Sequence, residues 1–330
     1  MENNVTETKA LTRQEKAIAR KNAAAAKRLA KKKTKIQESL GDKVLLAFTD
    51  VVLILIMIIV GYPVLYVISC SFSSNTALTT GRVLLFPVDF SLASYEFVFQ
   101  YDVVWQGYRN TIFYTVVGVV LTIIMEILTA YPLSKRNYQG RNVLMAYFFV
   151  TTMIGAGMIP TLLVRASMGL RNNVFAVILA GILSVNNMII LRTSFRNSIP
   201  GELYDAAAID GANDFQTLFK IALPLTKSTL SVLCLYAAVG KWNEYFTSMI
   251  YLPGRADLWP LQLVLRPILT ASQTLANQDL SSAQQAALEN SGTEGVIFAL
   301  IVIATVPVLA MYFLVQKYFE KGVMIGSVKG

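Results

Sequence analysis

The stretch "ELYDAAAIDGANDFQTLFKIALP", Glu202 to Pro224, is polar and lies between two strongly apolar segments. Its three consecutive alanines have high helix propensity and almost no side-chain bulk. Gly211 permits a positive φ, so the chain can turn at this residue. Asn213 or Asp214 has the right chemistry to cap a second helix. The stretch therefore predicts a short helix-turn-helix between two apolar segments.

The second predicted helix has one apolar face, because Phe215, Leu218, Phe219 and Ala222 follow one another at helical spacing. This face would attach the pair of helices to the rest of the chain. The alanine-rich first helix lacks a wall of side chains and would fit a groove on another protein. From the residues alone, an ordinary loop helix between two spans remains an equal alternative.

The composition indicates a membrane protein: 55% of the 330 residues are hydrophobic and 15% are charged, whereas soluble domains have about 25% charged residues. A spanning helix needs about 20 mostly apolar residues. We therefore expect an all-α polytopic membrane protein with six transmembrane helices and a helix-turn-helix outside the lipid. The candidate spans are Val44–Ile68, Thr111–Leu133, Val143–Val164, Val174–Leu191, Ser228–Leu252 and Val296–Val315.

The lysines and arginines predict the orientation, because cytoplasmic loops are enriched in them. With six spans, most basic residues fall on the side of the two termini and of the 200–224 segment, and the bias remains when the basic tail, 1–43, is left out. Both termini are therefore predicted to be cytoplasmic. The opposite side receives Arg82, Arg109, Arg165, Arg171, Arg255 and Arg266.

The basic tail itself is rich in alanine, lysine and arginine. We interpret it as a juxtamembrane segment attracted to anionic membrane lipid, at about 1 kcal/mol per basic residue near the surface. Nucleic-acid binding is disfavoured because "KAIARKNAAAAKRLAKKKTKIQ" holds no aromatic residue on which bases stack.

The 200–224 segment resembles the EAA motif of ATP-binding-cassette importer permeases. That motif reads Glu-Ala-Ala, three residues, Gly, nine variable residues and Ile-x-Leu-Pro. This chain has the required spacing and departs from it at Asp205, where the family usually has glutamate. The resemblance assigns ATPase coupling to Asp205, Ala206, Ala207, Asp210, Gly211, Leu223 and Pro224.

Five further stretches resemble the carbohydrate-uptake class of these permeases, and most of all the oligosaccharide and polysaccharide-fragment subgroup: "LTAYPLSKRNYQGRN", "GMIPTLLV", "RTSFRNSIPGEL", "GKWNEYF" and "PLQLVLRPIL". The resemblance covers roughly Val44 to Gly330 and makes 44–330 one transmembrane domain. It implies one half of a two-subunit pore in a bacterial plasma membrane. The implied partners are a second homologous permease, an ATP-binding-cassette ATPase dimer and an extracellular sugar-binding lipoprotein.

Other transport classes stay as alternatives. An importer for peptides or polyamines would use the same coupling segment. A self-sufficient secondary transporter or a membrane enzyme would need its own coupling-ion carboxylates in broken helices or a catalytic set.

Catalysis by this chain is not expected. The sequence has no G-x-x-x-x-G-K-[ST] loop for nucleotide phosphates and no histidine. Its two cysteines, Cys70 and Cys234, are too few for a thiolate zinc site. We therefore expect no cofactor or metal on this chain, with ATP and Mg used by the partner ATPase.

Polar groups inside spans are the candidates for the cargo path, because they are costly there and usually functional. Lys241 and Glu244 are three residues apart and would pair on one helix face; a purely structural pair is the alternative. Glu126 would pair with Lys241 or face a cavity. The long segment 253–295 is predicted to be an external loop, either a binding-protein contact or a flexible insert. The cargo-path candidates are Asn186, Asn187, Lys241, Trp242, Asn243, Glu244 and Tyr245.

Overall fold

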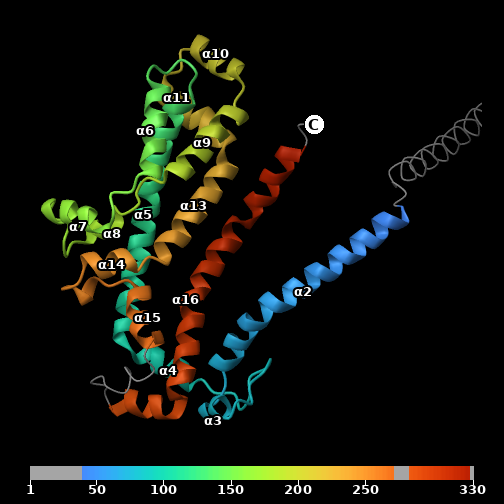
Figure 1. Cartoon of the computed structure of the whole chain (residues 1–330), viewed down its shortest axis with the longest axis vertical. Helices are drawn as coiled ribbons and strands as arrows, with labels where there is room; N and C mark the ends of the chain where they lie inside the picture. The colour runs from blue at the N-terminus through green and yellow to red at the C-terminus, as the bar shows by residue number, and fades with distance from the viewer. Residues whose placement is uncertain (1–38, 271–281, 328–330) are drawn as a thin grey trace, which may run out of the picture. The chain divides into compact units, whose positions relative to one another are not determined.

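The computed structural model describes residues 39–270 and 282–327, and within these ranges it contains helices and no strand. The long helices of Figure 1 coincide with the apolar runs of the sequence. The elements are α2 Leu40–Ser71, α3 Asn75–Thr79, α4 Ala93–Gln100, α5 Asp102–Ser134, α6 Arg141–Met153, α7 Met158–Ser167, α8 Val174–Ile178, α9 Val185–Ser198, α10 Gly201–Ile209, α11 Asp214–Thr217, the π-helix η1 Leu218–Ala222, α12 Leu223–Leu225, α13 Lys227–Trp242, α14 Phe246–Tyr251, the 3-10 helix η2 Ala256–Leu258, α15 Leu261–Thr270 and α16 Ser282–Ser327.

The chain divides into two units, Met1–Pro63 and Val64–Gly330. The described part of the first unit is the beginning of α2, whose most apolar window has no buried residue in this chain. A helix that is apolar all round needs lipid or another protein around it. This part of α2 therefore has the character of a membrane span.

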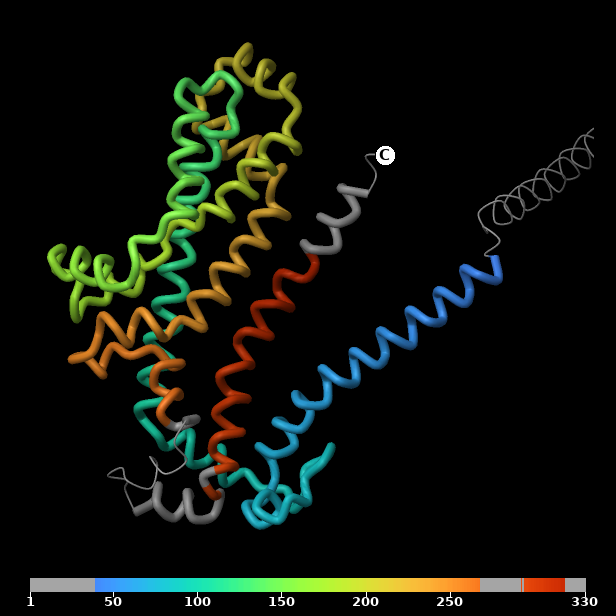
Figure 2. Tube along the Cα trace, in the orientation of Figure 1, coloured from blue at the N-terminus to red at the C-terminus, as the bar shows by residue number. Residues whose placement is uncertain are grey.

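The second unit is a helix bundle around α5, which packs against α9, α13 and α15. Helix α16 packs against α13 and α4. In Figure 2 α5 runs from the end that carries α10 and α11 to the opposite end, near α4. We call these two ends the α10 end and the α4 end.

Within residues 39–270 and 282–327, three helices are long and apolar enough to cross a membrane, or up to five if each of two bent pairs counts as one span. The first and second predicted spans lie inside the continuous helices α2 and α5. The sixth lies in Glu294–Lys317, the part of α16 that follows a break at Gly292, where φ is +67°. The all-helical membrane class is thus confirmed, while the number of six spans is not. The difference lies in the three remaining predicted spans, none of which is one straight helix.

The third predicted span, Val143–Val164, is broken into α6 and α7, which are bent by 116°. The break falls at Ile154–Gly157, where Gly157 has a φ of +78°. The sequence would suggest a kink at Pro160, but this residue lies in the first turn of α7, where proline is tolerated. The glycine at the start of α7 is therefore the residue that permits the break.

The fourth predicted span, Val174–Leu191, consists of α8, a connection and the beginning of α9. Gly181 in the connection has a φ of +62°. The fifth predicted span, Ser228–Leu252, ends as a helix at Trp242 and continues in the separate helix α14. The expectation of one continuous helix was wrong for the fourth and the fifth span. A run of apolar residues indicates a segment that can be buried in lipid, but it does not show whether the backbone forms one unbroken helix.

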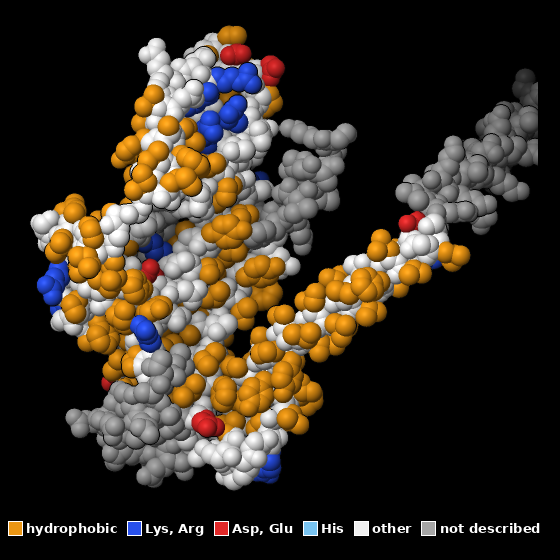
Figure 3. Space-filling model, viewed as in Figure 1, with side chains coloured by type: hydrophobic (Ala, Val, Ile, Leu, Met, Phe, Trp, Pro, Cys, Tyr) orange, Lys and Arg blue, Asp and Glu red, His pale blue; other side chains and the backbone are white. Residues whose placement is uncertain are grey.

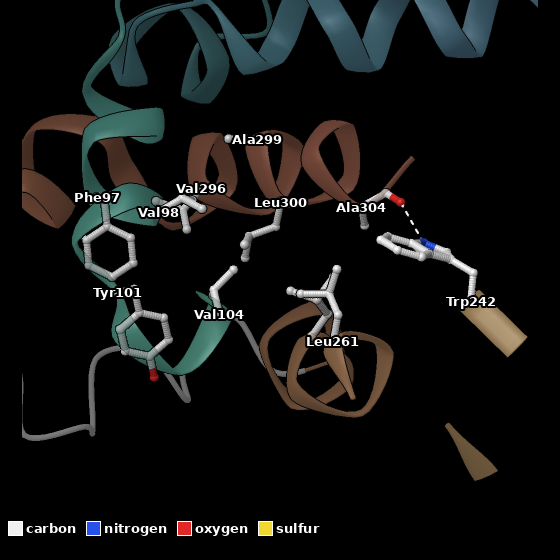
Figure 4. Packing of buried hydrophobic residues seen from close by; sticks show 11 residues of the cluster. Phe97, Val98, Tyr101, Val104, Trp242, Leu261, Val296, Ala299, Leu300 and Ala304 are labelled. Carbon is white, nitrogen blue, oxygen red and sulfur yellow. Dashed lines mark hydrogen bonds between the residues drawn. The ribbon is translucent and has the colours of Figure 1, made fainter. Parts of the chain in front are cut away.

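The core of the α4 end joins α4, α5, α13, α15 and α16 (Figure 4). Trp242 is buried there, and its Nε1–H donates to the carbonyl of Ala304 at 3.0 Å. The predicted external loop 253–295 begins inside this core, since Leu261 and Leu265 of α15 are buried. Gly107 brings α5 close to α15, because a Cβ there would lie 3.1 Å from Leu261 Cα.

The core of the α10 end joins the last turns of α5 to α9, η1 and α13. Its buried members include Leu133, Phe195, Leu218 and Leu233. In Figure 3 blue and red side chains gather at this end, above flanks on which hydrophobic side chains dominate. Such a distribution is typical of a bundle whose flanks face lipid and whose end faces water.

Candidate functional site

The 200–224 segment is a helix-turn-helix, as the sequence predicts. Helix α10 ends in a Schellman motif: the N–H of Gly211 donates to Ala208 O at 3.1 Å, and the N–H of Ala212 donates to Ala207 O at 2.9 Å. Gly211 has a φ of +73°, a conformation that glycine adopts at no steric cost. These two hydrogen bonds and the positive φ of Gly211 therefore fix the turn that follows α10.

The second helix begins at a capping box. The side chain of Asn213 accepts from the N–H of Gln216 at 2.8 Å, and the Gln216 side chain accepts from the N–H of Asn213 at 3.0 Å. The prediction of a cap at Asn213 is confirmed. Only half of the predicted apolar face is buried: Leu218 and Ala222 are buried, whereas Phe215 and Phe219 are exposed.

The residues assigned to ATPase coupling lie mostly on the outside of the molecule. Ala207 is buried against the protein and Leu223 is half-buried. Ile209 at the end of α10 is 87% exposed. The exposed members of the predicted set are Asp205, Ala206, Asp210, Gly211 and Pro224.

Lys135, at the end of α5, holds the helix-turn-helix to the bundle. Its Nζ lies 3.7 Å from Asp214 Oδ1, 3.7 Å from the centroid of the Tyr204 ring and 4.8 Å from that of Tyr131. Tyr204 belongs to α10 and Asp214 to α11, so one ammonium group contacts both helices of the segment. Burial lowers the pKa of Lys135, and the attraction of Asp214 opposes this shift.

A cavity of about 300 Å³ lies beside Lys135, between the end of α5 and α11. Its lining is mostly apolar and includes Ile127, Leu128, Tyr138 and Phe215. The only charged residues on its wall are Lys135 and Asp214, which pair with each other. The cavity therefore presents no charge that is left for a polar ligand.

Lys241 caps the break in the fourth predicted span. Its Nζ donates to the carbonyl oxygens of Ile178 at 3.0 Å, of Val177 at 3.4 Å and of Ala180. These carbonyls belong to the end of α8 and the residues just after it, where a helix carries partial negative charge. The aliphatic stem passes Gly118 of α5, where a Cβ would lie 3.0 Å from Lys241 Cε.

The predicted pairing of Lys241 with Glu244 is not observed: no ion pair between them is present among the described residues. Helix α13 ends at Trp242, so the helical spacing assumed for the pair does not continue. The Glu244 carboxylate instead accepts from the N–H of Thr247 at 2.7 Å and caps the start of α14. Both side chains stabilise broken helix ends.

The other cargo-path candidates separate into buried and exposed residues. Trp242 is a core residue and is not open to a ligand. Asn187 is half-buried. The exposed candidates are Asn186, Asn243 and Tyr245.

Glu126 is fully buried in α5, and neither carboxylate oxygen has a hydrogen-bond partner in the part of the chain that the structure describes. It therefore neither pairs with Lys241 nor faces an open surface of this chain. No group of three metal-ligating side chains occurs among the described residues.

Two residues that join elements of the structure were not singled out by the sequence analysis. Lys135 is one of them, although it lies in the stretch "LTAYPLSKRNYQGRN". Arg266 was assigned to the external loop, yet it lies on α15 against Tyr245 and Met249. A signal was present, because Arg266 is the single charged residue in the apolar stretch "PLQLVLRPIL".

The sequence matches one protein family, described as "Binding-protein-dependent transport system inner membrane component", over residues 36–325. Two relatives from Bacillus subtilis are similar along most of their length. The polygalacturonan/rhamnogalacturonan transport system permease protein YtcP is 37% identical over 278 residues, which are 84% of this chain and 96% of that protein. Protein LplC is 38% identical over 270 residues, 81% of this chain and 89% of that protein.

A solved structure is similar in both sequence and fold. It is a crystal structure of a bacterial ABC transporter involved in the import of the acidic polysaccharide alginate. The matched chain is 36% identical with a TM-score of 0.77, and the match covers 86% of this chain and all of that one.

Proposed function

Since the chain belongs to the family of binding-protein-dependent transport system inner membrane components, we propose that it moves oligosaccharides or polysaccharide fragments into the cell. It is a multi-pass plasma-membrane permease subunit of an ABC importer and not the ATP-hydrolysing subunit. The family implies an ATPase and a binding protein as partners. The carbohydrate cargo is supported by the relatives named for pectic polysaccharides and for alginate.

The proposed coupling depends on one observation: α10 is exposed on its outer side, while on its inner side Ala207 is buried and Tyr204 lies against Lys135. Its outward residues, among them Ala206 and Gly211, are open to a partner. Its base is held by Lys135, by Leu218 and by Ala222. We assign this surface to the groove of an ATPase subunit, so that closure of the ATPase dimer moves α10 and, through it, α5. ATP drives transport only if the two states of the importer bind the ATPase differently.

The remaining assignments follow from the same mechanism. A second homologous permease supplies the other half of the pore and covers apolar surface that is exposed on this chain. Both termini and the 200–224 segment lie in the cytoplasm. An extracellular sugar-binding lipoprotein delivers the cargo at the opposite side of the membrane, at the α4 end.

Substitutions at Gly211 test the coupling surface. Gly211→Ala carries only the backbone cost of a positive φ, about 1 kcal/mol. Apart from the two chain neighbours, no described residue has an atom within 4 Å of the new Cβ. Gly211→Trp has the same backbone cost and also places a bulky indole group on the surface. We expect Gly211→Ala to keep most ATP-driven uptake in proteoliposomes that contain the whole importer, and Gly211→Trp to lose more than about tenfold.

A measurement of ATPase binding distinguishes a steric clash at the coupling surface from a folding defect of the Gly211→Trp permease. The Gly211→Trp permease should still insert into the membrane and should fail to retain the ATPase during purification. Equal uptake by the two variants would show that the surface around Gly211 does not contact the ATPase.

A further inference from the structure

The cavity beside Lys135 lies at the depth of the membrane. Its wall includes Ile127 and Leu128, which belong to the last turns of the predicted span Thr111–Leu133 and therefore lie within the apolar layer. Leu128 and Phe215 on the wall are exposed in this chain, so the cavity is open to the surroundings of α5. A mostly apolar cavity at this depth meets lipid rather than water.

The lining of the cavity suits a hydrocarbon chain. The two charged side chains on its wall, Lys135 and Asp214, pair with each other and leave the rest of the lining mostly apolar. A void leaves the atoms around it without dispersion contacts on one side. Lipid tails are as apolar as leucine side chains, so a chain that enters from the bilayer loses no apolar environment and gains these contacts.

One hydroxyl group at the cavity lacks a partner. Tyr131 lines the cavity and is only 6% exposed. Its hydroxyl has no hydrogen-bond partner in the part of the chain that the structure describes. A buried polar group costs free energy when its hydrogen bond is not made. The ester carbonyl at the head of a lipid chain is an acceptor for such a hydroxyl, and a pure hydrocarbon offers none.

An arginine without a partner lies beside the cavity. Arg136 stands in the sequence between Lys135 and Tyr138, which both line the cavity. It is exposed, and its side chain makes no hydrogen bond or ion pair with another described residue. It follows the end of the predicted span at Leu133, which is the level of the lipid headgroups. A guanidinium group binds a phosphate through paired N–H donors.

We propose that this cavity binds one acyl chain of an anionic phospholipid from the leaflet at the α10 end, with the headgroup phosphate on Arg136 and the ester carbonyl on the Tyr131 hydroxyl. The site goes beyond the proposed function and does not depend on the cargo. Arg136 favours an anionic lipid, because a zwitterionic headgroup brings its own cation to the phosphate. Since the cavity joins α5 to α11, the bound chain contacts both the spanning helix and the 200–224 segment.

A segment of the ATPase is the competing occupant, because the 200–224 segment is assigned to the ATPase groove. The position of Ile127 and Leu128 inside the predicted span disfavours it. A water-soluble subunit would have to enter the hydrocarbon layer to reach these two residues. The lipid is already there.

The test measures lipid retention by native mass spectrometry of the complete importer in detergent. The probes are phosphatidylglycerol and phosphatidylcholine with identical acyl chains, supplied in equal amounts. We expect the wild-type permease to retain phosphatidylglycerol in excess. Leu128→Trp places an indole at the mouth of the cavity and should remove one retained phospholipid. Val116→Trp is the matched control, because it adds the same indole at an exposed position of α5 outside the cavity.

Two further variants test the polar contacts. Arg136→Gln should lower the ratio of retained phosphatidylglycerol to phosphatidylcholine about fivefold, the factor that corresponds to one basic residue at an anionic surface. Arg196→Gln removes an exposed arginine of α9 at the same end of the bundle and should leave this ratio unchanged. Tyr131→Phe should weaken the retention of both lipids and keep the ratio, because both carry the ester.

Three results would overturn the lipid site: equal retention of the two lipids by the wild type, equal lipid numbers on Leu128→Trp and Val116→Trp, or an unchanged ratio in Arg136→Gln. Loss of the ATPase from Leu128→Trp with an unchanged number of lipids would assign the cavity to the ATPase instead. If Leu128→Trp does not fold, as judged by its unfolding midpoint, the ratio measured for Arg136→Gln decides alone.

Discussion

Two lysines show how single side chains hold this bundle together. The ammonium group of Lys241 binds carbonyls at the end of α8. The ammonium group of Lys135, which lies at the end of α5, contacts an aspartate and two tyrosine rings. In each case the long aliphatic stem is packed and only the charged tip makes polar contacts. Each lysine contacts residues that are more than sixty positions away in the sequence.

Lys135 gives a prediction about pH. Burial lowers its pKa in the folded protein below the ordinary value of 10.5. Between the lowered pKa and 10.5, the unfolded chain binds more protons than the folded one, so the free energy of unfolding rises with pH in this interval. The cost of the buried charge is thus present at neutral pH and is relieved as the pH approaches 10.5.

The measurement is the thermal unfolding midpoint of the purified chain in detergent at increasing pH, compared with Lys135→Met. We expect the wild type to gain stability relative to Lys135→Met as the pH rises through this interval. Tyrosines that do not contact Lys135 titrate alike in both proteins and cancel. Tyr131 and Tyr204 contact Lys135, so the two proteins are compared below about pH 10, where tyrosine is protonated. A relative loss of wild-type stability in this interval would contradict the buried, charged state of Lys135.

At the scale of elements, the bundle consists of long continuous helices and of spans that are broken near α14. Helices α2, α5 and α16 follow from hydropathy because a long apolar run suffices to predict a long helix. The breaks depend on glycines with positive φ, such as Gly157 and Gly181. They also depend on distant donors, such as Lys241 for the carbonyl of Ile178, and a hydropathy pattern contains no information about such donors.

The same reasoning explains which parts of the candidate site were predictable. The helix-turn-helix follows from local chemistry, namely the alanines, Gly211 and Asn213, and it forms as predicted. The pairing of Lys241 with Glu244 assumed a helix that in fact ends at Trp242. The aromatic character of Trp242 alone could not distinguish a sugar contact from a hydrogen bond in the core. That distinction needs Ala304, 62 positions further along the chain.

Removal of the Lys241 ammonium tests the contact between α13 and α8. Lys241→Met keeps the stem against Gly118 and leaves the carbonyls at the end of α8 without their charged donor. An unsatisfied buried acceptor costs about 1–3 kcal/mol, so we expect the unfolding midpoint to fall accordingly. Lys227→Met, the same substitution at an exposed position of α13, should leave the midpoint nearly unchanged. Equal stability of Lys241→Met and the wild type would argue that water replaces the ammonium there.

At the scale of the whole molecule, the number of crossings decides where the termini lie. In the described part of the chain, three unbroken helical spans and two bent pairs amount to at most five spans. An odd number places the termini on opposite sides. The basic residues predict the same side for both, which requires an even number. Helices α8 and α9 together cover residues 174–198 and would supply the sixth crossing as a broken span.

Labelling of cysteines resolves the number of crossings. In a background in which Cys70 and Cys234 are replaced, Asp42→Cys and Lys317→Cys place single thiols near the two ends of the described chain. We expect a membrane-impermeant maleimide to label both only after the cells are permeabilised, and to label Asp89→Cys in intact cells. Labelling of Lys317→Cys but not Asp42→Cys in intact cells would instead establish an odd number of crossings.

Helix α5 has a mechanical consequence. It contains 33 residues and is therefore about 50 Å long, with Lys135 fastening one tip to the 200–224 segment and Gly107 pressed against α15 close to the other. A rigid rod of this length acts as a lever: a tilt of about 5° displaces its far tip by about 4 Å. Under the proposed coupling, we expect a small rocking of α10 to become a displacement of about 4 Å at the opposite tip of α5.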